Sequence, residues 1–212
     1  MTDDISRLIG AVKREVRQVE HDAKPATMVV MSRSFDTTLE DVWDAVTSAE
    51  RLPRWFLPIS GELKLGGRYQ LEGNAGGSIT RCEPPRELSV TWEFGGGTSW
   101  VNVSLSEEGP TTLLTLQHIA HPEPHWDRFG PGAVGVGWDL GLFGLARHIE
   151  NPARARPPEA DPAWIASDEA KRFMTLSGDD WCRADVAGGE DEARARARAD
   201  QTRTFYCGGG GS

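Results

Sequence analysis

Apolar and polar residues alternate along the central part of the chain, from residue 59 to residue 120. In one run Leu88, Val90 and Trp92 alternate with polar neighbours, and a similar run follows after three glycines. A period of two residues is typical of β-strands with one buried face. Glycine and proline pairs separate the runs so closely that successive strands would be joined by hairpins. The pattern predicts an antiparallel meander of about six strands, with one further strand over residues 28–35.

Helical spacing of apolar residues flanks this region. Over residues 4–20, apolar side chains recur every three or four positions, which predicts a helix that packs on the main domain or on a second subunit. A second long helix is predicted over residues 133–150. The other expected elements are a linker over 21–26, a capped helix from Leu39 to Val46, a short helix over 50–58, a loop over 120–132, a linker over 152–163, a short helix over 164–182, an Ala/Arg/Glu helix over 190–206 and a flexible tail over 208–212.

The predicted long helix contains four glycines, Gly135, Gly137, Gly141 and Gly144. A glycine inside a helix costs about 1 kcal/mol relative to alanine, so tertiary packing must offset roughly 4 kcal/mol. Close approach of a sheet or of a bound molecule to the bare helix face is one explanation. A helix that begins later, near Trp138, is the other.

Charge and composition exclude some partners. The chain carries 23 Lys and Arg against 32 Asp and Glu, with a formal net charge of -9. Non-specific nucleic-acid binding needs clustered cations, so we expect no nucleic-acid partner, and docking on an anionic membrane is disfavoured for the same reason. Three widely spaced cysteines and an N-terminus without an apolar signal core indicate a cytoplasmic location.

The chain has one cluster of histidines, His118, His121 and His125. Their spacing covers a strand end and a proline-containing loop without paired cysteines, so we expect no metal and no cofactor. A polar or general-base role at a cavity mouth and a plain surface position are the alternatives. The sequence contains no G-x-S-x-G element, no P-loop and no dinucleotide-binding glycine pattern.

Asp139 lies inside an apolar run, directly after Trp138. A buried carboxylate is costly unless it is paired, so this residue is a candidate acid–base group or ligand anchor. Alternatively it faces solvent or forms a salt bridge with Arg128 or Arg147.

Several short segments resemble the START-like (SRPBCC) superfamily, in the branch similar to the heat-shock-protein ATPase activator homologues. They are Ser34-Phe35, Glu40 to Trp43, Trp55-Phe56, Leu65 to Tyr69, Cys82 to Leu88, Thr91-Trp92 and Gly137-Trp138. The resemblance covers about residues 28–150 and implies an α+β helix-grip fold, in which a curved antiparallel sheet of six to seven strands surrounds a long C-terminal helix. The helical patterns described above add extra helices at both ends of the chain, outside this domain. The implied segments are an N-terminal helix and linker (1–27), the START-like domain (28–151), a helical extension (152–207) and a tail (208–212).

Members of this superfamily bind hydrophobic molecules between sheet and helix, and we therefore expect non-catalytic binding of a small hydrophobic molecule. The expected ligand-binding residues are mainly aromatic: Trp55, Phe56, Tyr69, Trp92, Trp100, His118, Phe129, Trp138, Asp139 and Phe143. One alternative is a cyclase or hydrolase that uses Asp139 and His118 as acid and base. Another is a protein-interaction or stress-regulatory module, with a possible homodimer through residues 4–20.

Overall fold

The structure, a computed structural model, describes residues 2–153 and 161–207 of the chain. The helices are α1 (Thr2–Gly10), α2 (Leu39–Thr47), the 3₁₀ helix η1 (Leu52–Arg54), α3 (Pro124–Phe129), α4 (Gly132–Glu150), α5 (Pro162–Ile165), α6 (Asp168–Ala187) and α7 (Glu192–Cys207). The strands are β1 (Lys13–His21), β2 (Lys24–Phe35), β3 (Ile59–Gly61), β4 (Arg68–Leu71), β5 (Gly76–Glu83), β6 (Glu87–Phe94), β7 (Gly97–Glu108) and β8 (Thr111–Ala120).

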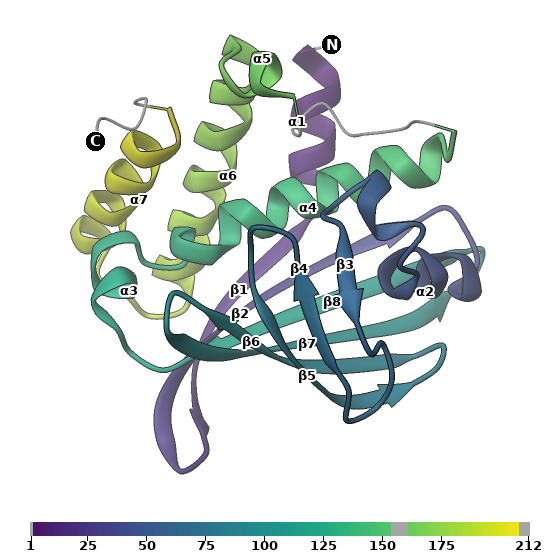
Figure 1. The fold of residues 1–212 in the computed structure, drawn as a ribbon. Coiled ribbons are helices and arrows are strands. Elements are labelled where there is room, and N and C mark those ends of the chain that lie inside the picture. The colour runs from purple at the N-terminus through teal and green to yellow at the C-terminus, as the bar shows by residue number, and fades with distance from the viewer. Residues whose placement is uncertain (1, 154–160, 208–212) are drawn as a thin grey trace. The chain divides into compact units, whose positions relative to one another are not determined.

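All eight strands belong to one sheet, in the order β1-β2-β8-β7-β6-β5-β4-β3 (Figure 1). Each pair from β3 to β8 is antiparallel and follows the chain order, as expected for a meander. The predicted α+β helix-grip class is confirmed, with eight strands in place of six to seven. The predicted long helix is also confirmed, and it begins at Gly132 rather than near Trp138.

The additional strand is β1, and the prediction of a single helix over residues 4–20 is wrong beyond Gly10. Val12 and Val16 are both buried. They are four residues apart, a spacing that fits one face of a helix and equally one face of a strand, because four is also a multiple of two. The apolar pattern therefore could not separate the two structures here.

The segment predicted as a linker over residues 21–26 is a hairpin turn followed by the start of β2. Asp22 and Ala23 form this turn with φ angles of 51° and 57°, the left-handed conformation that a two-residue hairpin requires. Such turns usually carry glycine or asparagine, and Asp-Ala lacks that signal.

The remaining predicted elements need smaller corrections. Only Leu52–Arg54 of the expected helix over 50–58 is helical, and α3 lies within the expected loop over 120–132. The expected helix over 164–182 is two helices, α5 and α6. The Ala/Arg/Glu helix is present as α7. Most of the predicted 152–163 linker and the whole 208–212 tail lie outside the described residues.

The described residues divide into two compact units. We call residues 31–120 and 144–153 the sheet unit, and residues 2–30, 121–143 and 161–207 the extension unit. In the extension unit, the N- and C-terminal segments group with the first part of α4.

In the sheet unit, α2 packs on β7 and β8. The Thr38 hydroxyl caps the N-terminus of α2, as the sequence pattern predicts. The Thr112 hydroxyl donates a hydrogen bond of 2.8 Å to the Thr37 carbonyl, and the Trp55 indole N–H donates one of 2.9 Å to the Ala45 carbonyl. These bonds fix both ends of α2 on its own unit.

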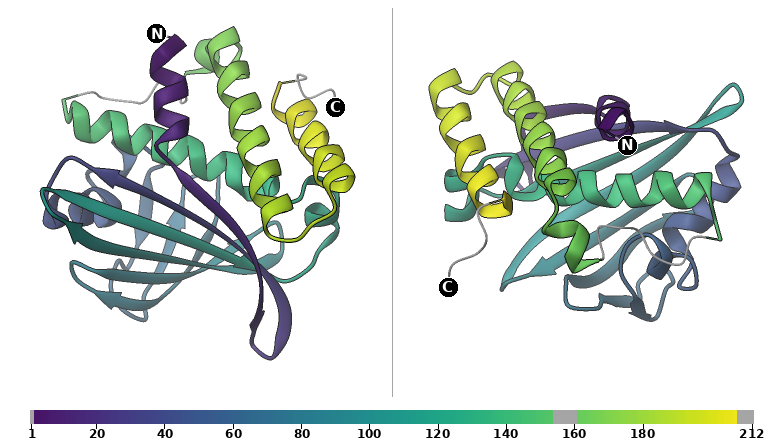
Figure 2. Two further views of the ribbon diagram at one scale, coloured as in Figure 1. Left: turned by 180° about the vertical axis from the view of Figure 1, so that it is seen from behind. Right: turned by 90° about the horizontal axis from the view of Figure 1, so that it is seen from above.

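In the extension unit, α6 packs against α1, β1 and α7. Both views in Figure 2 show α6 and α7 side by side. The apolar residues Ile5, Leu8 and Ile9 of α1 are buried within the chain. Most of the apolar stripe of residues 4–20, on which the homodimer prediction rests, is therefore covered in the single chain.

The glycines near the start of α4 make room for this packing. A Cβ atom placed on Gly135 would lie 2.3 Å from Cε2 of Trp181 in α6, and one on Gly132 would lie 2.7 Å from Oγ1 of Thr202 in α7. Real Cβ atoms do not approach neighbours this closely. At these two positions the bare helix face accommodates C-terminal helices, rather than the sheet or bound molecule that the sequence suggested.

We expect Gly135→Ala to lower the free energy of unfolding by about 1–3 kcal/mol, because the new methyl group must displace the Trp181 indole. Gly137→Ala is the matched control in the same helix, since its Cβ would meet nothing closer than the Tyr206 hydroxyl at 3.9 Å. Because alanine has a higher helix propensity than glycine, Gly137→Ala should stabilise the protein by up to about 1 kcal/mol. Urea unfolding followed by tryptophan fluorescence measures both, and equal effects of the two variants would contradict this account.

Candidate functional site

One face of the sheet unit is largely apolar. Side chains of directly paired residues in antiparallel strands lie on the same face, and alternate residues lie on opposite faces. The register pairs Val90 with Val101, and Val101 with His118. The residues that share this face, called the apolar face below, are Tyr69, Leu71, Ile79, Leu88, Val90, Trp92, Ser99, Val101, Val103, Leu114, Leu116 and His118.

The apolar face is not uniformly covered. Tyr69, Leu71 and Ile79 form a buried cluster, and Trp92 and Phe56 are only partly buried where they pack against it. Along β6 every residue from Glu87 to Glu93 is partly buried, although the strand is hydrogen-bonded on both sides within the sheet. The apolar side chains of β6 therefore keep accessible surface in the middle of the sheet.

His118 is a buried polar residue of the apolar face. Its Nε2 lies 2.8 Å from the Ser99 hydroxyl, which donates a hydrogen bond of 3.2 Å to the Trp92 carbonyl. Since that hydroxyl has a single hydrogen, it accepts from a protonated Nε2 of His118. The Trp92 and His118 ring centroids are 6.2 Å apart. Burial lowers the pKa of His118 to about 4, so the imidazole is neutral near pH 7.

The other predicted aromatic residues of the sheet unit have different surroundings. Trp100 directly precedes Val101 in β7 and pairs with Ile119. Since successive residues of a strand point to opposite faces, Trp100 lies on the face opposite to Trp92 and His118. The Trp55 ring stacks on Phe56 with 5.4 Å between centroids. Its indole N–H already donates to the Ala45 carbonyl in α2. Trp55 therefore packs between α2 and Phe56.

Asp139 lies in the extension unit at the centre of a buried charge network. Arg14, at the start of β1, binds its carboxylate through two nitrogens, with Nη2 to Oδ1 at 2.9 Å and Nε to Oδ2 at 3.1 Å. Ser177 and Trp181 of α6 donate to Oδ2 at 2.5 and 3.0 Å. A second carboxylate, Asp180, accepts from Arg14 at 2.8 Å.

This network replaces the partners that the sequence suggested, Arg128 and Arg147. Burial raises the pKa of the Asp139 carboxyl, while the Arg14 guanidinium opposes this effect. Both carboxylate oxygens are engaged, and the arrangement is that of a structural ion pair. His118 belongs to the sheet unit and has its own partner in Ser99, so the contacts of neither residue identify an acid–base pair.

The remaining predicted ligand residues also lie in the extension unit. Phe143 packs against Phe173 and Trp164, with ring centroids 5.1 and 5.9 Å apart. Phe129 packs against Phe205, with centroids 5.5 Å apart. Trp138 is partly buried. Phe143 and Phe129 therefore take part in packing of the C-terminal extension.

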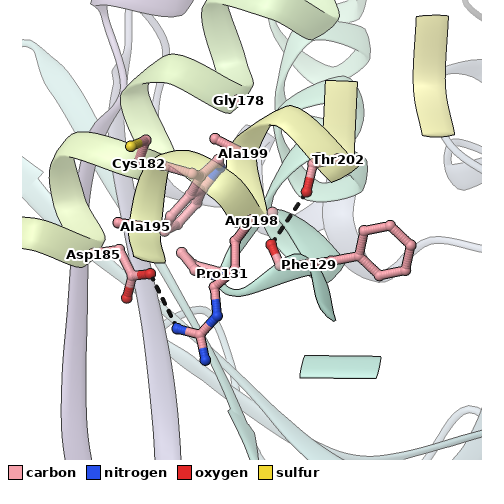
Figure 3. A pocket seen from close by; sticks show the side chains of 11 residues that line it. Phe129, Pro131, Gly178, Cys182, Asp185, Ala195, Arg198, Ala199 and Thr202 are labelled. Carbon is pink, nitrogen blue, oxygen red and sulfur yellow. Dashed lines mark hydrogen bonds and ion pairs between the residues drawn. The ribbon is translucent and has the colours of Figure 1, made fainter. Parts of the chain in front are cut away.

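The extension unit also contains a small recess between α3, α6 and α7 (Figure 3). Its volume of ≈ 10 Å³ has room for about one water molecule. Arg198 and Asp185 face each other in its wall at 3.6 Å, and Thr202 donates to the Phe129 carbonyl at 3.1 Å. A recess of this size cannot hold a hydrophobic molecule.

Sequence reasoning missed a polar cluster in the sheet unit. Arg51, directly before η1, donates from Nη1 to Asp41 Oδ1 at 2.7 Å and to Asp44 Oδ2 at 3.1 Å. Its Nε donates to Nε2 of His148 at 3.2 Å. His148 is 2% exposed, and its Nδ1 has no hydrogen-bond partner in the described part of the chain. A buried donor without an acceptor costs about 1–3 kcal/mol, so this atom needs an explanation.

Within residues 2–153 and 161–207, no three His, Cys, Asp or Glu side chains are grouped so that they could hold a metal ion. Across the same described ranges, none of the helices combines the length and the apolar character that crossing a membrane requires.

Comparisons with known proteins give a family and several similar structures. The family described as "Activator of Hsp90 ATPase homolog 1-like protein" matches residues 36–150. The crystal structure of CalU16 from Micromonospora echinospora is 33% identical, covers 82% of this chain and 98% of that chain, and has a TM-score of 0.67. The solution NMR structure of CalU16 is 31% identical, covers 84% and 97%, and has a TM-score of 0.69.

A third similar structure is DynU16, described as a putative protein in the dynemicin biosynthetic locus. It is 24% identical, covers 61% of this chain and 49% of that chain, and has a TM-score of 0.53. A comparison with curated proteins found no match. CalU16 covers more of this chain than residues 36–150, so its similarity includes part of the terminal segments.

We expect Arg14→Met to destabilise the protein by about 3–5 kcal/mol, because Asp139 stays buried without its counter-ion. The double variant Arg14→Met/Asp139→Leu should lose less free energy of unfolding than Arg14→Met alone, because it removes both buried charges. Arg17→Met on the same strand removes an exposed arginine and should change stability by less than about 1 kcal/mol. Urea unfolding measures all three, and a double variant less stable than Arg14→Met would contradict the ion-pair account.

His118 predicts a pH dependence of stability. Its pKa is about 4 when folded and close to the ordinary 6.5 when unfolded. As pH falls from 6.5 toward 4, the unfolded chain takes up a proton that the folded chain excludes, and the free energy of unfolding should fall by up to about 3 kcal/mol. Above pH 6.5 both states are neutral and this contribution is constant. His118→Gln, which keeps a donor for Ser99, should remove this part of the slope, and an unchanged slope would refute the assignment.

Proposed function

Because the chain belongs to the Activator of Hsp90 ATPase homolog 1-like family, within the START-like superfamily, we propose that it binds a small hydrophobic molecule on the apolar face of the sheet unit, without catalysis. The cavity between sheet and helix that the sequence predicts stays a prediction. The proposal made here depends on residues of the sheet unit alone.

The observation that carries the proposal is the accessibility of β6. A central strand normally buries the apolar side chains of at least one face, because a second layer of structure packs on that face of the sheet. In β6, Leu88, Val90 and Trp92 are all only partly buried. Burying apolar surface releases about 25 cal/mol per Å², so an apolar molecule on this row gains affinity from area alone.

The polar content of the same face limits the ligand class. His118 is neutral at physiological pH and is engaged with Ser99. The residues assigned above to the apolar face are therefore mostly rings and aliphatic groups, with few polar atoms and no charged side chain. Such a surface suits an uncharged, mostly apolar molecule, since an ionic group would lose hydration without gaining a counter-ion.

The proposal includes no catalysis, because the hydrogen bonds of the candidate acid–base residues already occupy them. A general base needs a lone pair that reaches the substrate, and a general acid needs a proton to give. Asp139 has both oxygens occupied by Arg14, Ser177 and Trp181.

The family description points to a second candidate function, a module that acts on another protein.

The test uses the neutral fluorophore N-phenyl-1-naphthylamine. The wild-type protein should bind it with saturable fluorescence enhancement, and Trp92→Ala should weaken binding about tenfold through loss of an aromatic contact. Trp100→Ala is the matched control, because it removes the same side chain from the opposite face and should leave binding unchanged. Circular dichroism confirms that both variants are folded.

Saturable binding that Trp92→Ala and Trp100→Ala weaken equally would contradict the assignment of the apolar face. No saturable binding by the wild-type protein would contradict the proposed function itself and would favour the protein-interaction alternative.

A further inference from the structure

Trp92 is the partly buried tryptophan of β6, and the carbonyl groups on both sides of its Cα atom accept hydrogen bonds from side-chain hydroxyls. The Tyr69 hydroxyl donates to the Thr91 carbonyl at 2.8 Å, and the Ser99 hydroxyl donates to the Trp92 carbonyl at 3.2 Å. Tyr69 and Ser99 both belong to the apolar face, and Trp92 packs against the cluster that contains Tyr69. Both donors therefore lie on the same face of the sheet as the indole.

Tyr69 in β4 reaches β6 across the intervening strand β5, where it pairs with a glycine, Gly77. A Cβ atom on Gly77 would lie 2.0 Å from the Thr91 carbonyl oxygen, which is the acceptor of the Tyr69 hydrogen bond. Any side chain at this position would therefore displace the acceptor. Burial raises the pKa of the Tyr69 hydroxyl, so this group keeps the proton that it donates.

Ser99 in β7 pairs directly with Trp92. A serine hydroxyl can rotate and has one proton to donate. Here the hydroxyl oxygen accepts from Nε2 of His118 at 2.8 Å, so the proton is directed to the Trp92 carbonyl. The buried imidazole thus fixes the orientation of the second donor.

These two hydrogen bonds act on the backbone dihedral angles of Trp92. A peptide group is planar, so holding its oxygen restricts the whole group. The Thr91 carbonyl belongs to the peptide group before the Trp92 Cα atom, and the Trp92 carbonyl belongs to the one after it. With both groups held, φ and ψ have little freedom and the direction of the Cα–Cβ bond is set. A side chain whose position is fixed in advance loses less conformational entropy when a ligand packs against it.

We propose that the hydroxyl groups of Tyr69 and Ser99 are positioning groups of the ligand site, which hold the backbone on both sides of Trp92 and preorganise its ring for the bound hydrophobic molecule. This inference rests on the proposed function and adds two specific residues to it. The two hydroxyls act through Trp92 and make no contact of their own with the ligand.

The test measures the affinity for N-phenyl-1-naphthylamine in Tyr69→Phe and Ser99→Ala, each of which removes one hydroxyl and little else. Each variant should bind the fluorophore about threefold to fivefold more weakly than the wild-type protein, the effect of losing one hydrogen bond. Thr80→Val is the matched control, because it removes an exposed hydroxyl that donates to the Ser89 carbonyl of the same strand at 3.1 Å. It should leave the affinity unchanged, and circular dichroism confirms that all three variants are folded.

A double-mutant cycle tests whether the hydroxyls act through Trp92. In the Trp92→Ala background, Tyr69→Phe and Ser99→Ala should change the affinity by less than about twofold, because the ring that they position is gone. An equal loss in both backgrounds would overturn the inference, since it would indicate a general structural effect or a direct contact with the ligand.

Fluorine-19 NMR of the ligand-free protein labelled with 5-fluorotryptophan gives a second readout. The Trp92 resonance, identified by its absence in Trp92→Phe, should shift or broaden in Tyr69→Phe and Ser99→Ala and stay in place in Thr80→Val. An unchanged resonance in the first two variants would overturn the inference without any ligand. If the wild-type protein shows no saturable binding, the proposed function fails and the inference fails with it. If it binds and only Trp92→Ala weakens binding, the inference alone fails.

Discussion

A buried guanidinium must be surrounded by carboxylates and carbonyl oxygens, and the extension unit is organised around this requirement of Arg14. Its nitrogens bind Asp139 in α4 and Asp180 in α6, together with the Val12 carbonyl at 2.9 Å. Three segments that are far apart in the chain therefore meet at one charge. Trp181 joins the packing and the electrostatics, because its ring fills the space beside Gly135 and its N–H donates to Asp139.

In the sheet unit, two buried histidines each hold a tautomer that their hydrogen-bond partner defines. His118 donates from Nε2 to Ser99, whereas His148 accepts on Nε2 from Arg51. Both rings are neutral because burial disfavours the charged form. Neutral histidines add directional hydrogen bonding to an apolar environment without the desolvation cost of an ion.

Much of the sheet could be predicted from the sequence because a period of two is a local signal, visible over five or six residues. The parity that separates Trp100 from Val101 is equally local, so the position of Trp100 on the other face was already contained in the pattern. The ambiguity at Val12 and Val16 is different, since a spacing of four fits both a helix and a strand. At Val12 and Val16, the strand is favoured by the hairpin that the Asp22-Ala23 turn forms, and the composition of this turn gives no hairpin signal in the sequence.

The partners of Asp139 could not be predicted, because Arg14 is 125 positions away. Nearby arginines such as Arg147 are the natural candidates when only local spacing is known. His148 was missed for a similar reason, as its significance depends on Arg51 and on burial, which are properties of the folded chain. Chemistry that arises from long-range contacts leaves no periodic trace.

The contact between Gly135 and Trp181 has a consequence for how the family diverges. The matched family region ends at residue 150. The Trp181 indole, which occupies the space that a side chain at position 135 would need, lies beyond that region. Evolution should therefore treat the two positions as a pair. A relative without the C-terminal helices would be free to carry alanine at the equivalent of Gly135, whereas one that keeps the tryptophan should keep the glycine.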